Sequence, residues 1–224
     1  MEYIRITKID DPLFAKMHAF MQSVFPPEEV LEFSQWEGPL GDEGLRVYVA
    51  VHEGEVVGAT EYRYYSDMNV AMTDFTIVGK AGLSIGRFLA KNREADLLEW
   101  AKSTGQTSLG MFAEIYDPYR VEEKFQGKVK VMDPYVRREV LSHLGYKRLD
   151  FSYVHPSWED NGASAVSGLD LGFMPVDDSV TELPAALVVQ FLTTYYAILA
   201  NKPTEWLDMI ESLKQKETVK LLGL

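Results

Sequence analysis

The stretch Val78–Leu89, VGKAGLSIGRFL, places small residues where an apolar, strand-like run gives way to a helix-like run. Gly82, Ser84 and Gly86 occupy alternate positions across this junction. Small side chains let an anion approach the backbone, and the first turn of a helix offers N–H groups and a positive dipole end. The junction therefore fits a pyrophosphate cradle, and it fits equally a strand-to-helix turn that needs small residues only for packing.

Other common chemistries have no counterpart in the sequence. Neither G-x-x-x-x-G-K-[ST] nor G-x-G-x-x-G occurs, so the two common nucleotide loops are excluded. The chain has no cysteine, which removes disulfides, thiolate catalysis and cysteine zinc sites. Its four histidines show no H-E-x-x-H spacing, so we expect no metal site.

Composition describes a globular protein with a strongly acidic balance. Of the 224 residues 46% are apolar, and the net charge is −12. Such a field repels nucleic acid and favours a cationic partner such as an amine, although it serves solubility as well. No apolar run is long enough for a membrane span, and the N-terminus has no export pattern. We therefore expect a cytoplasmic protein with neither membrane nor nucleic acid as a partner.

The elements around the junction form a β-meander followed by alternating strands and helices. A first strand and a helix starting at Asp11 precede the meander, and a helix over 84–102 follows it. The expected strands are 3–9, 45–51, 55–65, 70–78, 107–115, 146–156 and 168–176. Further helices are expected over 28–36, 135–144, 183–200 and 204–216. This order predicts an α/β (α+β) fold with a mixed, mainly antiparallel sheet and helices on both faces.

Four segments in this order resemble the GNAT N-acetyltransferase superfamily. Ala81–Gly86, AGLSIG, is similar to the acyl-CoA loop [QR]-x-x-G-x-[GA], with Ala81 in place of glutamine or arginine and Ser84 in place of glycine. FPPEE at 25–29, the hairpin at 45–63 with its V-G pattern, and LSHLGYKRLDF at 141–151 resemble other superfamily segments. The resemblance implies a GNAT-like acyl-CoA-binding domain over 1–178. Residues 179–224 are then a helical extension that packs on the domain or on a partner subunit.

The resemblance implies an acyl-CoA-dependent N-acyltransferase, a transferase whose default acyl donor is acetyl-CoA. The amine attacks the thioester directly in a ternary complex, without a metal. A backbone N–H near Ile77 or Val78 is expected to stabilise the thioester oxygen. The residues expected to bind the coenzyme are Ile77, Val78, Lys80, Ala81, Gly82, Leu83, Ser84, Ile85, Gly86 and Arg87.

Acid–base residues are less clearly marked. Glu114 interrupts an apolar strand and is our predicted base, with Asp74 and Glu61 as alternatives, although a strand-end carboxylate is often structural. The position where the superfamily often has a tyrosine acid is Leu141, so Tyr135 on the same helix is predicted as its substitute. Tyr116, Tyr119 and protonation of the thiolate by solvent are the alternatives.

The amine substrate is a small molecule or a peptide. We expect Glu29, Glu61, His155 and Trp158 to contact it. Two other functions stay open: a non-catalytic GNAT-fold module that binds acyl-CoA or regulates, and an acidic interaction protein that uses its terminal helices. The apolar run at 183–200 must be covered by the domain or by a second copy in a homodimer.

Overall fold

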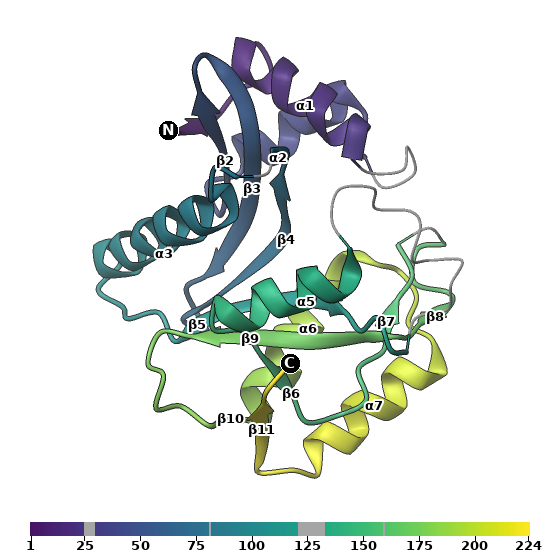
Figure 1. Ribbon diagram of the computed structural model, residues 1–224. Helices are drawn as coiled ribbons and strands as arrows, with labels where there is room; N and C mark the ends of the chain where they lie inside the picture. The colour runs from purple at the N-terminus through teal and green to yellow at the C-terminus, as the bar shows by residue number, and fades with distance from the viewer. Residues whose placement is uncertain (25–29, 81, 121–132, 159) are drawn as a thin grey trace. The chain divides into compact units, whose positions relative to one another are not determined.

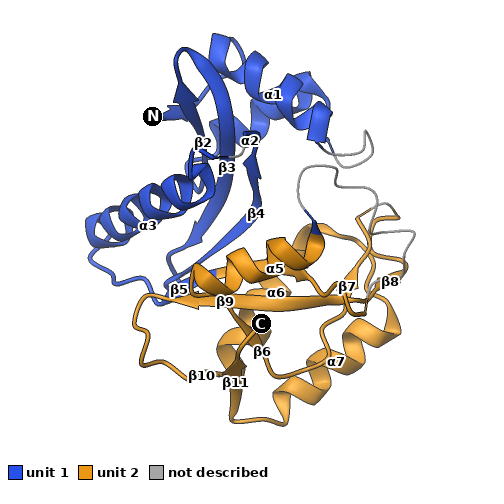
Figure 2. Ribbon diagram, in the orientation of Figure 1, with its two compact units in different colours: residues 1–111, 127–133 blue, residues 112–126, 134–224 orange. Residues whose placement is uncertain are grey.

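The computed structural model describes residues 1–24, 30–80, 82–120, 133–158 and 160–224 (Figure 1). The chain forms two compact units, coloured separately in Figure 2. Unit 1 comprises residues 1–111 and 127–133, and unit 2 comprises residues 112–126 and 134–224.

Unit 1 contains an antiparallel meander preceded by an added strand. Its strands are β1 (Glu2–Ile6), β2 (Leu45–His52), β3 (Glu55–Tyr65) and β4 (Val70–Val78), and they lie in that order. Gly54, at φ +81°, makes the tight turn between β2 and β3, a conformation that glycine adopts without steric cost. Gly58 lies opposite Val78, and Glu61 lies opposite Phe75. The predicted meander is confirmed.

Helices pack on both faces of this sheet because its side chains alternate. Helix α1 (Pro12–Val24) buries Phe14 and Met17 in a core with Val49. Helix α3 (Ile85–Ser103) buries Leu89 in a second cluster with Ala50, the neighbour of Val49 along β2. This unit therefore contains a sheet with helices on both faces, as predicted.

The short helices of unit 1 differ from the prediction. Where a helix over 28–36 was expected, the described residues form η2 (Phe33–Trp36) and α2 (Glu37–Gly41), which extends beyond the expected range. The reason is tertiary, because Trp36 and Leu40 are buried in the α1-side core. On α3 the apolar Leu98 is exposed, whereas the charged Arg93 is buried.

Unit 2 begins within β5 (Gly110–Tyr116) and contains strands of its own. The strands of this unit lie in the order β5-β9-β6-β11-β10, and β7 pairs separately with β8. Their bounds are β6 (Lys147–Leu149), β7 (His155–Pro156), β8 (Ala165–Val166), β9 (Leu169–Pro175), β10 (Glu182–Pro184) and β11 (Thr218–Leu222). The helices are α5 (Pro134–His143), α6 (Ala185–Tyr195), η3 (Tyr196–Ile198) and α7 (Thr204–Lys214). Strand β9 thus lies between β5 and β6 although it follows β6 in the sequence.

The C-terminal segment differs from the helices expected there. It contains β10 and β11 as well, and β11 pairs antiparallel with β6, opposite Leu149. Helix α6 is covered within its own unit, where Phe191 stacks on Phe112 at a centroid distance of 4.0 Å. The strand expected over 146–156 is present only as the short β6 and β7. The domain boundary at 178 and a homodimer stay predictions.

Candidate active site

The junction between β4 and α3 has a backbone shape that depends on its small residues. Gly79 donates its N–H to the Val57 carbonyl over 2.9 Å, which fixes the chain as it leaves β4. Gly82 has φ +86°, and a Cβ added to it would meet nothing within 4 Å, so its role is conformational. Ser84, the N-cap residue of α3, has φ 53° and makes no side-chain cap hydrogen bond.

The first turn of α3 is suited to an anion. It contains no acidic residue, and a helix N-terminus presents N–H groups and a partial positive charge. Lys80, which precedes α3, and Arg87, in its first turn, are both exposed. The side chain of Ile85, in contrast, is 1% exposed, so only its backbone is available to a ligand. Gly86 has no side chain to cover the backbone of the first turn. A Cβ built at Gly86 would lie 3.4 Å from the Cγ2 of Val78.

Buried polar residues fix α3 to the sheet behind this turn. The Arg93 Nη1 donates to the hydroxyls of Thr60, Thr73 and Thr76 over 3.1, 3.1 and 2.7 Å. One turn further along, the carboxylate of Asp96 accepts hydrogen bonds from the guanidinium of Arg46 and from two tyrosine hydroxyls. These tyrosines are Tyr48 and Tyr62. The helix that carries the candidate phosphate site is therefore held rigidly in its unit.

Glu61 lies in the interior of unit 1 rather than on its surface. It is 3% exposed, and neither carboxylate oxygen has a hydrogen-bond partner in the part of the chain that the structure describes. Burial, and next the neighbouring carboxylate of Asp74, raise the pKa of Glu61 well above its ordinary value. A direct contact with substrate, as predicted for Glu61, would therefore require this side chain to become accessible.

In unit 2, Glu114 on β5 lies at the centre of an aromatic cluster. Its Oε1 accepts hydrogen bonds from the hydroxyls of Tyr153, over 2.5 Å, and Tyr196. Burial, followed by the Glu114 charge, raises the pKa of both tyrosines well above the ordinary value, so both are donors at neutral pH. The Glu114 carboxylate is thus held in place by two hydroxyl groups.

Two predicted substrate-binding residues join this cluster. The His155 ring is 8% exposed and stacks parallel to Tyr196 at 6.3 Å. Trp158 is 47% exposed, and its ring centroid lies 5.7 Å from that of Tyr196 and 6.0 Å from that of Tyr195. The structure thus brings Glu114, His155 and Trp158 together around Tyr196.

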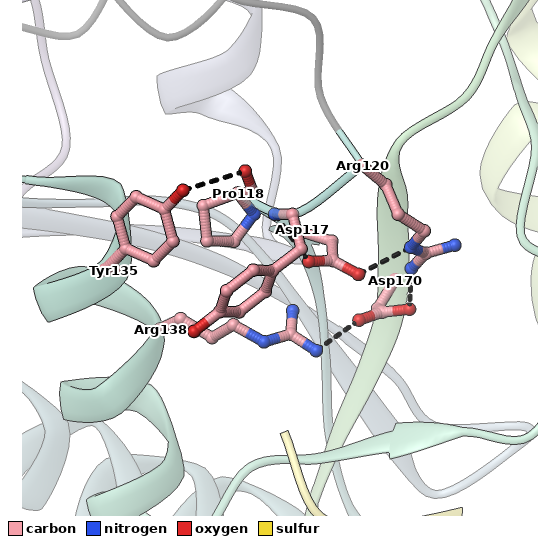
Figure 3. A network of polar contacts seen from close by, with 7 residues as sticks. Asp117, Pro118, Arg120, Tyr135, Arg138 and Asp170 are labelled. Carbon is pink, nitrogen blue, oxygen red and sulfur yellow. Dashed lines mark hydrogen bonds and ion pairs between the residues drawn. The ribbon is translucent and has the colours of Figure 1, made fainter.

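The predicted acid Tyr135 lies elsewhere in unit 2, beside a network of charges (Figure 3). It is 45% exposed, and its hydroxyl donates a long hydrogen bond of 3.4 Å to the Pro118 carbonyl. Below it, the buried Asp170 of β9 pairs with Arg138 of α5 over 2.7 Å and also with Arg120. This network joins β9, α5 and the end of β5.

Sequence reasoning missed the residues that organise these sites. Tyr153 and Tyr196 were not distinguished among 12 tyrosines, and Arg93 and Asp96 were not singled out within their predicted helix. Arg93 carried one usable signal, because a helical spacing of four residues places it in line with the apolar Leu89 and Leu97.

Glu29 and Ala81 lie outside the described residues. Among the residues that are described, no group of three or more histidine, aspartate or glutamate side chains is placed to hold a metal ion. Within that same part of the chain, none of the helices has the length and apolarity to cross a bilayer.

Comparison with solved structures identifies the fold of the chain. No protein-family model matches the sequence, and neither does any curated protein. A structure described as an acetyltransferase of the GNAT family from Bacteroides thetaiotaomicron matches 90% of this chain and 100% of its own, with a TM-score of 0.56 and 14% identity. An aminoglycoside 6'-N-acetyltransferase complexed with coenzyme A matches 77% of this chain and 95% of its own, with a TM-score of 0.51 and 18% identity.

A third similar structure acts on a protein. It is the ribosomal-protein-S18-alanine N-acetyltransferase from Escherichia coli, which matches 79% of this chain and 95% of its own at a TM-score of 0.50 and 9% identity. At such identities the matches establish the architecture: the chain has the fold of the GNAT acetyltransferases.

Proposed function

We propose that this protein is an acyl-CoA-dependent N-acyltransferase, with acetyl as the default acyl group. The observation that carries the proposal is the β4–α3 junction. A left-handed glycine leads into a rigidly held helix whose first turn has no acidic residue and is flanked by the exposed Lys80 and Arg87. These features suit the pyrophosphate of coenzyme A. The GNAT fold of the chain and the coenzyme A in one similar structure support the same assignment.

In the proposed reaction the amine attacks the thioester carbonyl directly, and the thiolate of coenzyme A leaves. The backbone N–H of Ile77 or Val78, at the end of β4, is proposed to stabilise the oxygen as negative charge develops on it. The residues of the junction from Lys80 to Arg87 hold the coenzyme. No metal takes part in the proposed chemistry.

Unit 2 contains two residues that we propose to bind the amine. Glu114 offers a carboxylate and Trp158 a half-exposed aromatic face, and both features bind cationic amines. Glu114 is our proposed base, and the two tyrosine hydroxyls that donate to it fix the position of its carboxylate. Tyr135 remains our proposed acid for the leaving thiolate.

The similar structures act on an aminoglycoside and on the alanine of a ribosomal protein, so both a small molecule and a peptide are proposed as amine classes here.

Titration calorimetry with acetyl-CoA tests the coenzyme site. Wild type, Gly82→Trp and Gly105→Trp are compared, because Gly82 and Gly105 share a positive φ and have open space where a Cβ would lie. Gly105 follows the C-terminus of α3, so it controls for strain without touching the junction. We expect micromolar binding by wild type and by Gly105→Trp, and at least tenfold weaker binding by folded Gly82→Trp.

A folded wild-type protein that does not bind acetyl-CoA would remove this function and leave the interaction protein. Binding without release of free coenzyme A across a panel of amines would favour the non-catalytic module. The panel contains aminoglycosides, polyamines, amino acids and peptides, and a thiol reagent detects the coenzyme.

A further inference from the structure

The three glycines of the β4–α3 junction differ in what surrounds them. A Cβ added to Gly82 would meet nothing within 4 Å, and one added to Gly86 would only reach the Cγ2 of Val78 at 3.4 Å. A Cβ added to Gly79, in contrast, would overlap the ring of Phe20, at 2.7 Å from its Cε2. Because interior atoms do not approach one another so closely, the Phe20 ring occupies the space that a side chain at residue 79 would need.

Gly79 continues the alternation of β4, whose successive residues point to opposite faces of the sheet. Ile77 packs in the core on the α1 side, whereas Val78 packs in the cluster on the α3 side. The N–H of Gly79 still pairs with β3, since it donates to the Val57 carbonyl over 2.9 Å. Gly79 therefore follows Ile77 on the α1 face, and the ring of Phe20 takes the place of its side chain.

Phe20 lies at the rim of the buried face of α1. Met17, one turn before it, and Val24, one turn after it, are both buried, whereas Phe20 is half-buried. Helical spacing places these three side chains on one side of the helix. Phe20 packs against the core that contains the other two and keeps part of its surface accessible. The ring is therefore held by the core and can still be reached by a ligand.

The place of this ring matters because the proposed oxyanion donor is close to it. The backbone N–H of Ile77 or Val78 is proposed to bind the thioester oxygen, and Gly79 is the next residue along the chain. An acyl group on that thioester would lie within reach of the Phe20 ring. A rigid aromatic ring offers a small acyl group an apolar contact, and it leaves no room for a longer chain.

We propose that Phe20 sets the length of the acyl group and restricts this protein to short acyl-CoA esters such as acetyl-CoA. Phe20 contacts the acyl group and is a specificity-determining residue, and Gly79 is needed to admit its ring. The inference rests on the proposed function, because it uses the proposed place of the thioester.

Titration calorimetry with a series of acyl-CoA esters tests the proposal without an amine. Acetyl-, butyryl- and hexanoyl-CoA are titrated into wild type, Phe20→Ala and Phe33→Ala. Phe33 is the matched control, because it is a 37% exposed ring that packs against Phe14 of the α1-side core at 4.8 Å between centroids. In wild type and in Phe33→Ala, affinity should fall by at least about tenfold from acetyl- to hexanoyl-CoA. In Phe20→Ala the two affinities should lie within about twofold of each other.

The outcomes separate this inference from the proposed function. Equal affinity of wild type for acetyl- and hexanoyl-CoA would overturn the inference and leave the function in place. A preference for acetyl-CoA that persists in Phe20→Ala would do the same. A folded wild-type protein that binds none of the three esters would overturn the function, and the inference with it.

A double-mutant cycle tests the contact between the two residues and needs no ligand. Gly79→Ala places a methyl group where the Phe20 ring lies, so it should lower the melting temperature of wild type. In a Phe20→Ala background the methyl group has room, and the same change should lower the melting temperature less. Equal losses in the two backgrounds would show that the ring does not fill this space, and would overturn the inference whatever the calorimetry shows.

Discussion

The hydroxyl of Tyr196 donates a hydrogen bond to the carboxylate of Glu114, although 82 positions separate the two residues in the chain. A second hydroxyl, that of Tyr153, donates to the same oxygen, and the two hydroxyl oxygens lie 2.6 Å apart. This contact ties the turn after α6 to β5 in the interior of unit 2. It also fixes the carboxylate of the residue that sequence analysis predicts as the base.

Removing the Tyr196 hydroxyl should weaken unit 2. Tyr196→Phe keeps the ring, which is fully buried, but takes one donor from a charged acceptor. We expect a loss of about 1.5–3 kcal/mol in the free energy of unfolding, measured in urea. Tyr119→Phe, at a ring 78% exposed, should change it by less than about 0.5 kcal/mol. Equal effects of the two variants would mean that the buried hydrogen bond contributes nothing.

The pKa of Glu61 predicts how stability depends on pH. Because the pKa is raised in the folded state, the folded protein binds more protons than the unfolded chain above about pH 4.3, so this contribution to stability falls as pH rises. Glu61→Gln does not titrate. Its melting temperature should therefore exceed that of wild type by a margin that grows from pH 4.5 to pH 8. A constant margin would contradict the raised pKa.

Gly58 should resist substitution because helix α3 packs directly against it. A Cβ at this position would lie 2.5 Å from the Ile85 Cγ2 and 2.9 Å from the Ile77 carbonyl oxygen. We expect Gly58→Ala to cost about 1–3 kcal/mol in thermal or urea unfolding. Gly38→Ala, in α2 with nothing within 4 Å of the new methyl group, should be neutral or slightly stabilising. A tolerated Gly58→Ala would show that α3 can shift on the sheet.

The buried ion pairs of Asp170 should be far more sensitive than those at the surface. Asp170→Asn leaves Arg138, whose side chain is 11% exposed, without its anionic partner. The expected loss is about 3–5 kcal/mol in the free energy of unfolding. Asp42→Asn breaks the more exposed pair with Arg63 and should cost less than about 1 kcal/mol. Similar losses in the two variants would contradict the importance of burial here.

Ser84 occupies a left-handed conformation that glycine adopts without strain. This conformation costs a non-glycine residue about 1–2 kcal/mol, which a change to glycine removes. Glycine also gives the unfolded chain more conformational freedom, which lowers the stability gained by about 0.4–1 kcal/mol. Ser84→Gly should thus raise the free energy of unfolding by up to about 1 kcal/mol. Ser103→Gly, within α3, should lower it. A less stable Ser84→Gly would mean that the serine side chain makes a contribution of its own.

The elements that are determined by residues close together in the sequence were predictable. The meander follows from alternation and from the Gly54 turn, and α3 follows from its apolar spacing. Strand β11 was not predicted, because five residues after a helix become a strand only when β6 and β10 are present to pair with them. The sequence also directed attention to Glu114, His155 and Trp158, but the tyrosine that joins them comes from a distant turn. No local pattern encodes such a contact.

The fixation of α3 by Arg93 and Asp96 has a consequence for how a ligand is received. Because these contacts hold α3 on the sheet, binding at its first turn should cost little conformational entropy for placing the helix. A phosphate-bearing molecule would then meet a preformed surface. Its association rate would be governed by diffusion and by the nearby positive charges of Lys80 and Arg87 rather than by a slow rearrangement of the helix.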